Sequence, residues 1–325
     1  MATYKELHGS NIETVSSDPS NPIAGQVWYN STSQTMKGFT SNPVGSWATG
    51  GALNTGRYAI SSAKFGTQTA SLGFGGTTAA PAKTGATESY DGSSWTEVND
   101  LSTARDVLAG IGTQAAAIAA GGTIAGGNTE NTESWNGTSW TEVNNLNTAR
   151  MQLAGTGTST AGLALGGSPD GGSYLAVTEK WNGTSWTEVG DLNTGRYGLG
   201  AAGTNTAALA IGGYTGSPVD ETEVWNGTSW TEVADLNSAR SGSTGAGYTN
   251  TAAMTFGGTA GANTELWNGT SWTETNNMGT AREYVGGAGT TASAIAFGGE
   301  PASPNGTLTE EWTAPTDATV SFDVS

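Results

Sequence analysis

The charged side chains best placed for chemistry are arginines and glutamates that recur in a fixed order along the chain. Each glutamate stands two residues before an aromatic residue, so its carboxylate and the ring share one strand face. One arginine and one glutamate per repeat predict a ring of charge pairs, within or between repeats, with bidentate contact as one geometry. The set comprises Arg57, Arg105, Arg150, Arg196, Arg240 and Arg282 with Glu88, Glu133, Glu179, Glu223, Glu265 and Glu310.

The even spread of these arginines argues against catalysis. A sialidase-like site needs several arginines around one carboxylate, and arginines distributed around a ring do not converge there. Glycoside hydrolysis needs two carboxylates about 5–9 Å apart. The 28 acidic residues leave such a pair open by number alone, but spacing marks none out. We therefore interpret the charge ring as structural.

Residue types that carry other catalytic chemistry are scarce. His8, in the N-terminal segment, is the only histidine, and the sequence has no cysteine. Histidine-based triads, cysteine nucleophiles and the common zinc sites therefore lack the residues that would build them. We expect a non-enzymatic protein with no metal site and no cofactor.

A repeat of 42 to 48 residues positions the charges. In each copy a tryptophan is followed by leucine or methionine six residues later and by the arginine ten residues later. A Gly-Gly pair and then a tyrosine or tryptophan complete the copy. The leading tryptophans are Trp47, Trp95, Trp140, Trp186, Trp230 and Trp272. A fixed period of this length indicates a repeat architecture.

Each copy contains four short apolar or aromatic segments separated by turn residues. In the copy after Arg105 they are residues 108–113, 115–120, 132–135 and 139–143, and Asn136-Gly137 joins the last two. Asn-Gly is a strong hairpin signal because both residues tolerate a positive φ. Four strands in a repeat of this length match one blade of a β-propeller.

The order of Gly-Gly, aromatic residue, tryptophan and arginine resembles the kelch repeat over residues 46–312. The resemblance implies an all-β fold, a six-bladed kelch-like β-propeller with four-stranded blades. The last copy stops after Trp312 without a fourth strand, so we expect the strand around Trp47 to complete that blade and close the ring. Seven blades, with residues 35–40 as an extra third strand, are the alternative. The presence of only six arginine and Gly-Gly units favours six.

The loops between the second and third segments vary in length and content, whereas the turns between the third and fourth are nearly identical. Variable loops on a rigid scaffold are common recognition sites. Loops that vary under no constraint are the alternative interpretation. For a binding face on these loops, the candidate residues are Lys83, Asp170, Tyr174, Tyr214, Asp220 and Glu300.

Residues 1–45 and 313–325 lie outside the repeats, as an N-terminal anchoring segment and a C-terminal tail. Residues 25–32 read GQVWYNST and resemble lead-in segments of bacteriophage structural and tail-fibre proteins, notably those of marine phages. The WNGTSWTEV repeats are similar to kelch-like proteins of such phages. The resemblance implies a virion surface protein, on tail or capsid, for host contact or decoration. A stand-alone glycan-binding or glycan-hydrolysing propeller is the alternative.

The expected partners follow from this assignment and from the composition. The N-terminal segment would bind other virion proteins, the propeller a host-surface glycan or protein, and the chain would form a homo-oligomer. The formal net charge of −17 disfavours nucleic acid, which needs a cationic patch. An acidic surface favours solubility, with weak binding of cations or of a cationic partner as the alternative. Because no apolar run reaches roughly 18 residues and no signal peptide is evident, we expect no membrane contact and synthesis in the host cytoplasm before assembly into the virion.

Overall fold

The computed structural model describes residues 12–23, 25–42, 45–301 and 306–322. The chain divides into two compact units, of which the larger comprises Ser46–Thr313. The smaller unit comprises Met1–Gly45 together with Ala314–Ser325. Every sheet belongs to one unit only.

The larger unit contains six four-stranded antiparallel sheets, numbered 1 to 6 in chain order. Sheet 1 consists of β6 (Ser61–Ser62), β7 (Ser71–Phe74), β9 (Thr87–Tyr90) and β10 (Trp95–Val98). Sheet 2 consists of β11 (Ala109–Thr113), β12 (Ala116–Ala120), β15 (Thr132–Trp135) and β16 (Trp140–Val143). Sheet 3 consists of β17 (Ala154–Thr158), β18 (Ala161–Leu165), β19 (Thr178–Trp181) and β20 (Trp186–Glu188). Sheet 4 consists of β21 (Gly200–Thr204), β22 (Ala207–Tyr214), β23 (Pro218–Trp225) and β24 (Trp230–Glu232). Sheet 5 consists of β25 (Thr244–Thr249), β26 (Ala252–Phe256), β27 (Thr264–Trp267) and β28 (Trp272–Thr275). Sheet 6 consists of β29 (Gly286–Gly289), β30 (Ser293–Phe297), β31 (Thr309–Thr313) and β4 (Ser46–Thr49).

Short elements lie between these sheets. They are the two-stranded ladders β5 (Arg57–Tyr58) with β8 (Thr77–Thr78) and β13 (Thr123–Ile124) with β14 (Gly127–Asn128), and the 3-10 helix η1 (Gly258–Ala260). The predicted all-β class with four-stranded units is confirmed.

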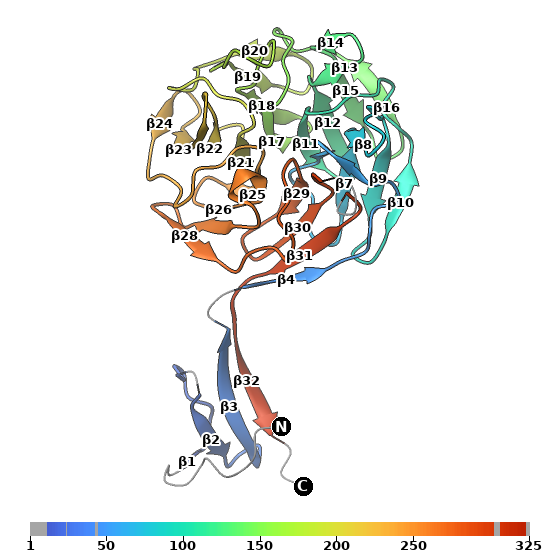
Figure 1. Cartoon of the computed structure of the whole chain (residues 1–325). Coiled ribbons are helices and arrows are strands. Elements are labelled where there is room, and N and C mark those ends of the chain that lie inside the picture. The colour runs from blue at the N-terminus through green and yellow to red at the C-terminus, as the bar shows by residue number, and fades with distance from the viewer. Residues whose placement is uncertain (1–11, 24, 43–44, 302–305, 323–325) are drawn as a thin grey trace. The chain divides into compact units, whose positions relative to one another are not determined.

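The first strands of the six sheets surround a common centre (Figure 1). They contact one another in a cycle that runs from β6 through β11, β17, β21, β25 and β29 and back to β6. Sheet 6 takes its fourth strand from the start of the unit, because β4 pairs with β31 and places Trp47 opposite Trp312. The predicted pairing of these two tryptophans is confirmed. The arrangement is consistent with a β-propeller.

The turns between third and fourth strands follow from the Asn-Gly pairs. Gly137 has φ +93°, a left-handed conformation that glycine adopts without strain. The side-chain oxygen of Asn136 accepts hydrogen bonds of 2.9 Å from the backbone N–H groups of Thr138 and Ser139. The two residues thus supply both the backbone geometry and the hydrogen bonds of the turn, which explains why the repeats share them.

Tryptophan side chains link neighbouring sheets. The fourth-strand tryptophan of each sheet donates its indole N–H to a threonine hydroxyl on the third strand of the preceding sheet, at 2.9 to 3.2 Å. For example, Trp140 of sheet 2 donates to Thr87 of sheet 1. The series closes because Trp95 of sheet 1 donates to Thr309 of sheet 6. The core therefore consists of apolar layers between sheets, with the indole N–H groups satisfied.

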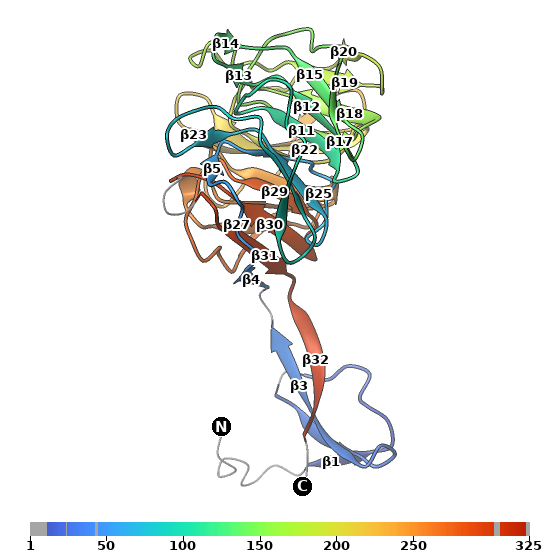
Figure 2. The same ribbon diagram turned by 90° about the vertical axis from the view of Figure 1, so that its right-hand side faces the viewer.

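The smaller unit contains one sheet of β1 (Glu13–Val15), β2 (Val27–Asn30), β3 (Thr35–Asn42) and β32 (Thr316–Phe322). Figures 1 and 2 both show β3 and β32 side by side, in an antiparallel register that runs from Met36 opposite Phe322 to Asn42 opposite Thr316. Residues 313–325 were expected to form a separate tail; most of them belong instead to this strand. Residues 35–40 lie in β3 of this sheet, so they are not the third strand of a seventh repeat.

Candidate functional site

All six predicted arginine–glutamate pairs form, and each lies within one repeat. The arginine enters the sheet from the preceding connection, and the glutamate is on the third strand of that same sheet. The side chains of the arginines are at most 1% exposed. The N···O distances are 3.2 Å for Arg57–Glu88, 3.0 Å for Arg105–Glu133 and 2.8 Å for both Arg196–Glu223 and Arg282–Glu310, and the contacts Arg150–Glu179 and Arg240–Glu265 complete the set.

The second carboxylate oxygen of each glutamate has a different partner. It accepts the backbone N–H of the residue three positions before the arginine, at 2.5 to 2.8 Å. In sheet 3, Glu179 contacts Arg150 through one oxygen and the backbone N–H of Asn147 through the other. The bidentate geometry is therefore not adopted. The carboxylate ties the connection between sheets to the third strand.

Burial lowers the pKa of Arg150 below its ordinary value, and the facing Glu179 acts in the opposite direction. The same balance holds for Arg57, Arg105, Arg240 and Arg282. A guanidinium stays protonated in proteins, so each pair remains an ion pair. No ligand reaches groups buried to this extent, and the ring of pairs holds the fold together.

Three tyrosines, from sheets 3 and 4 and the connection between them, form an aromatic cluster that reaches the surface through Tyr174. Tyr197 and Tyr214 are stacked, with ring centroids 5.1 Å apart and an interplanar angle of 25°. Tyr174 lies 5.6 Å from Tyr197 and 6.2 Å from Tyr214, and it is 38% exposed. We call Tyr174, Tyr197 and Tyr214 the tyrosine cluster. Two of its members were predicted as binding residues.

Tyr197 was missed because it directly follows a repeat arginine, in the connection rather than in a variable loop. Its backbone pairs with that of Tyr214. The same bridge recurs between Asp106 and Thr123 and between Met151 and Ser168. The residue after the arginine therefore adjoins the variable loop. Its variation among repeats, from tyrosine to aspartate to methionine, was the signal that could have revealed it.

The other four predicted binding residues do not join the cluster. Lys83 forms an ion pair of 2.6 Å with Asp106. Asp170 accepts hydrogen bonds of 2.7 to 2.9 Å from the backbone of Gly172 and from the backbone and hydroxyl of Ser173, and these bonds hold its pKa below its usual range. Those bonds stabilise its own loop rather than leave the carboxylate free.

Asp220 is exposed on β23, where its backbone carbonyl accepts the N–H of Leu236. Glu300 pairs through its backbone with Glu283. Burial, and then the charge of Glu300, raises the pKa of Glu283. The six predicted residues are thus distributed around the loops, and only the tyrosines meet.

A second feature, absent from the sequence predictions, lies at the centre of the larger unit. The residue two positions after each arginine has a left-handed backbone conformation, with φ between +48° and +64°. Each of these residues donates its backbone N–H to the carbonyl of its counterpart in the preceding sheet, at 2.7 to 3.2 Å. The six bonds close a circle, which we call the axial ring: Ala59, Val107, Gln152, Gly198, Gly242 and Tyr284.

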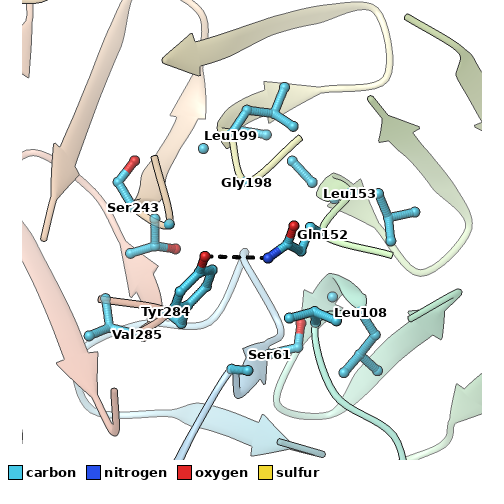
Figure 3. Close-up of a pocket in the computed structure, with 18 of the residues that line it drawn as sticks. Ser61, Leu108, Gln152, Leu153, Gly198, Leu199, Ser243, Tyr284 and Val285 are labelled. Atoms are coloured by element: carbon cyan, nitrogen blue, oxygen red, sulfur yellow. Dashed lines mark hydrogen bonds between the residues drawn. The ribbon is translucent and has the colours of Figure 1, made fainter. Parts of the chain in front are cut away.

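A cavity of about 80 Å³ adjoins the axial ring and is lined by residues of the first strands of sheets 1 to 5 and of the connections that precede the first strands of all six sheets. The amide of Gln152 donates to the hydroxyl of Tyr284 at 3.3 Å, across the centre of the view in Figure 3. Lys64 also lines this axial cavity.

No protein-family model matches the chain, and no curated protein matches it. Among the described residues, no helix is long and apolar enough to cross a membrane. Within the same ranges, no group of three or more histidine, cysteine, aspartate or glutamate side chains is arranged to hold a metal ion. His8 lies outside the described residues. Fold and site together define an all-β, propeller-like scaffold with an exposed tyrosine cluster and an axial cavity.

Proposed function

We propose that the chain is a six-bladed, kelch-like β-propeller that acts as a non-enzymatic recognition protein on the surface of a phage virion. Three observations support six blades: the six four-stranded sheets, the cyclic contacts of their first strands and the closed hydrogen bonds of the axial ring. Completion of sheet 6 by β4 agrees with the ring closure common in propellers.

The virion assignment rests on the lead-in segment and on the repeat sequences. Residues 25–32, which carry the resemblance to phage structural proteins, form β2 and the turn after it in the smaller unit. Because the smaller unit has its own sheet, it can serve as the part of the chain that attaches to other virion proteins. The chain itself would assemble as a symmetric homo-oligomer.

The observation that carries the recognition role is the tyrosine cluster. Tyrosine combines a large apolar face with a hydroxyl and loses little side-chain entropy on binding. A sugar ring offers the matching chemistry, because one face carries C–H groups that pack on an aromatic ring while its hydroxyls form hydrogen bonds. The cluster joins a variable loop to a rigid sheet, so the proposed ligand is a host-surface glycan.

Substitution of Tyr174, the most exposed member of the tyrosine cluster, tests the recognition role. We expect Tyr174→Ala to weaken binding of the protein to host-cell polysaccharides at least about tenfold, a loss on the order of 1.4 kcal/mol. Tyr58→Ala is the matched control, because Tyr58 occupies the repeat position of Tyr197 in sheet 1 and has no ring contact in the described part of the chain. Equal binding by both variants would refute a role for the cluster.

Two further measurements separate the virion protein from a stand-alone propeller. Antibodies against the chain should label intact phage particles, and a stand-alone protein would leave the particles unlabelled. Incubation with a bound polysaccharide should release no new reducing ends, whereas a hydrolase would release them.

A further inference from the structure

The side chain of Lys64 lines the axial cavity, although the other repeats have no charged residue at this position. Lys64 stands seven residues after Arg57, and in the other five copies this position is a glycine: Gly112, Gly157, Gly203, Gly247 and Gly289. These glycines all have positive φ, between +94° and +144°. Lys64 is not among the residues of positive φ. Sheet 1 therefore departs from the repeat here, and it replaces a residue without a side chain by an ammonium group.

The ammonium group reaches across the unit. Lys64 Nζ donates to the hydroxyl of Thr244 in sheet 5 and to the carbonyl of Gly287 in sheet 6, the latter at 3.4 Å. In the described part of the chain, no carboxylate lies within ion-pair distance of it. Burial lowers the pKa of Lys64 to about 8, so it still carries a charge at neutral pH.

An unpaired ammonium in a largely buried position is costly unless an anion accompanies it. The chain has 28 acidic residues, yet none faces Lys64 within the described ranges. Lys37, Lys83 and the six repeat arginines each contact a carboxylate. The described part of the chain thus supplies Lys64 with hydroxyl and carbonyl partners but with no counter-charge.

The surroundings of Lys64 supply room and further donors. The cavity of about 80 Å³ is lined by Ser61, Ser243 and Thr244 as well as by small residues such as Gly155. The hydroxyl of Ser243 is buried and has no hydrogen-bond partner among the described residues. A cavity needs roughly 10–15 Å³ to hold one water molecule, so the axial cavity has room for an ion of a few heavy atoms.

Hydrogen bonds and ring stacking fix the side chains at the axial ring and next to Lys64. Gln152 and Tyr284, from sheets 3 and 6, form the hydrogen bond at the axial ring (Figure 3). Next to Lys64 in the chain, Phe65 stacks on Tyr248 of sheet 5 with ring centroids 4.8 Å apart, and Tyr248 donates to the carbonyl of Gly66 at 2.8 Å. An ion inside is partly shielded from water, which strengthens its attraction to an ammonium.

From this geometry we propose that the axial cavity binds a small oxyanion, the size of phosphate, sulfate or acetate, as the counter-ion of Lys64. The hydroxyl groups of Thr244 and Ser243 are its further donors. The site is independent of the tyrosine cluster and of the proposed glycan.

Calorimetric titration of the full chain with phosphate, sulfate and acetate tests the proposal, with chloride at matched ionic strength as the reference. We expect saturable binding of an oxyanion to the wild type and at least tenfold weaker binding to Lys64→Gln. Lys64→Arg keeps the charge and should retain binding. Lys180→Gln removes an equal charge from β19, outside the cavity, and should bind as the wild type does. Comparison of the three oxyanions identifies which one the site prefers.

Absence of saturable binding to the wild type, or equal affinity for Lys64→Gln, would overturn the proposal. A second measurement does not depend on the folding of any variant. Crystals of the wild type soaked in selenate should show an anomalous peak within hydrogen-bond distance of Lys64 Nζ. A cavity without that peak under saturating selenate would also overturn it.

Discussion

Replacement of Glu179 by glutamine tests whether the buried carboxylates hold the repeats together. Glu179 is fully buried and accepts hydrogen bonds from the guanidinium of Arg150, the backbone N–H of Asn147 and the side-chain amide of Asn147. Glutamine has nearly the same shape but only one oxygen. Its amide N–H₂ group must therefore face either the guanidinium or the donors of Asn147.

The expected cost follows from the burial of the arginine. Removal of one partner from a buried ion pair costs about 3–5 kcal/mol, because the other charge stays behind without compensation. Arg150 is 0% exposed, and its remaining partners are backbone carbonyls of Thr148, Ala164 and Gly166. At roughly 2 °C per kcal/mol for a chain of this size, Tm should fall by about 6–10 °C.

The assay is thermal unfolding followed by circular dichroism, with Glu188→Gln as the control. Glu188 lies opposite Glu179 on β20 and is exposed, so its substitution changes the net charge equally without burying an unpaired group. We expect the control to lie within about 0.5 kcal/mol of the wild type. A double variant, Arg150→Met with Glu179→Leu, removes both charges and should recover part of the loss. A Tm for Glu179→Gln equal to that of Glu188→Gln would refute the structural role of the charge ring.

Three further predictions follow from the packing, the axial cavity and the axial ring. Trp47→Ala should destabilise the larger unit by about 2–4 kcal/mol, because the ring lies 5.0 Å from Phe256 and 5.6 Å from Trp312 and completes sheet 6; an unchanged urea midpoint would contradict it. Lys64 has a folded pKa of about 8 against an ordinary value of 10.5, so its charge opposes folding fully below pH 8 and less as the pH rises to 10.5. In chloride buffer the wild type should therefore gain about 1–3 kcal/mol relative to Lys64→Met between pH 7 and pH 10, and parallel pH profiles of the two urea midpoints would show that Lys64 is not desolvated. Val107→Gly should cost less than about 1 kcal/mol, because Val107 has φ +48° and glycine relieves that strain. Val98→Gly, in the regular strand β10, should cost more, and a reversed order of the two melting temperatures would contradict this prediction.

The sequence predicted those structural features for which the same residue type has the same structural role in every repeat. The Asn-Gly turns, the four strands and the arginine–glutamate pairs all depend on the identity of a residue, so they recur visibly. The pairing of Trp47 with Trp312 followed from the copy that lacks a fourth strand. In each of these cases, the identity or the absence of a repeated residue marks the feature in the sequence.

The axial ring could not be read in this way, because it uses only backbone groups. Its six members are alanine, valine, glutamine, glycine, glycine and tyrosine, and no shared side chain marks the position. Lys64 was overlooked for a related reason: its partners Thr244 and Gly287 are brought near it by ring closure, more than 170 residues along the chain. The strand in the C-terminal tail was not predicted, because it depends on pairing with β3, to which no turn connects it.

The axial ring also bears on how such a chain changes in evolution. Every donor and acceptor in the circle is used once, and all point the same way round, so the circle has no loose end at which another member could be added. Duplication or loss of one repeat in the gene would break bonds of this circle, and bonds of 2.7 to 3.2 Å would form again only with a different angle between all neighbouring sheets. A change in the number of repeats therefore affects every repeat through the axial ring, whereas a change in an outer loop affects one repeat.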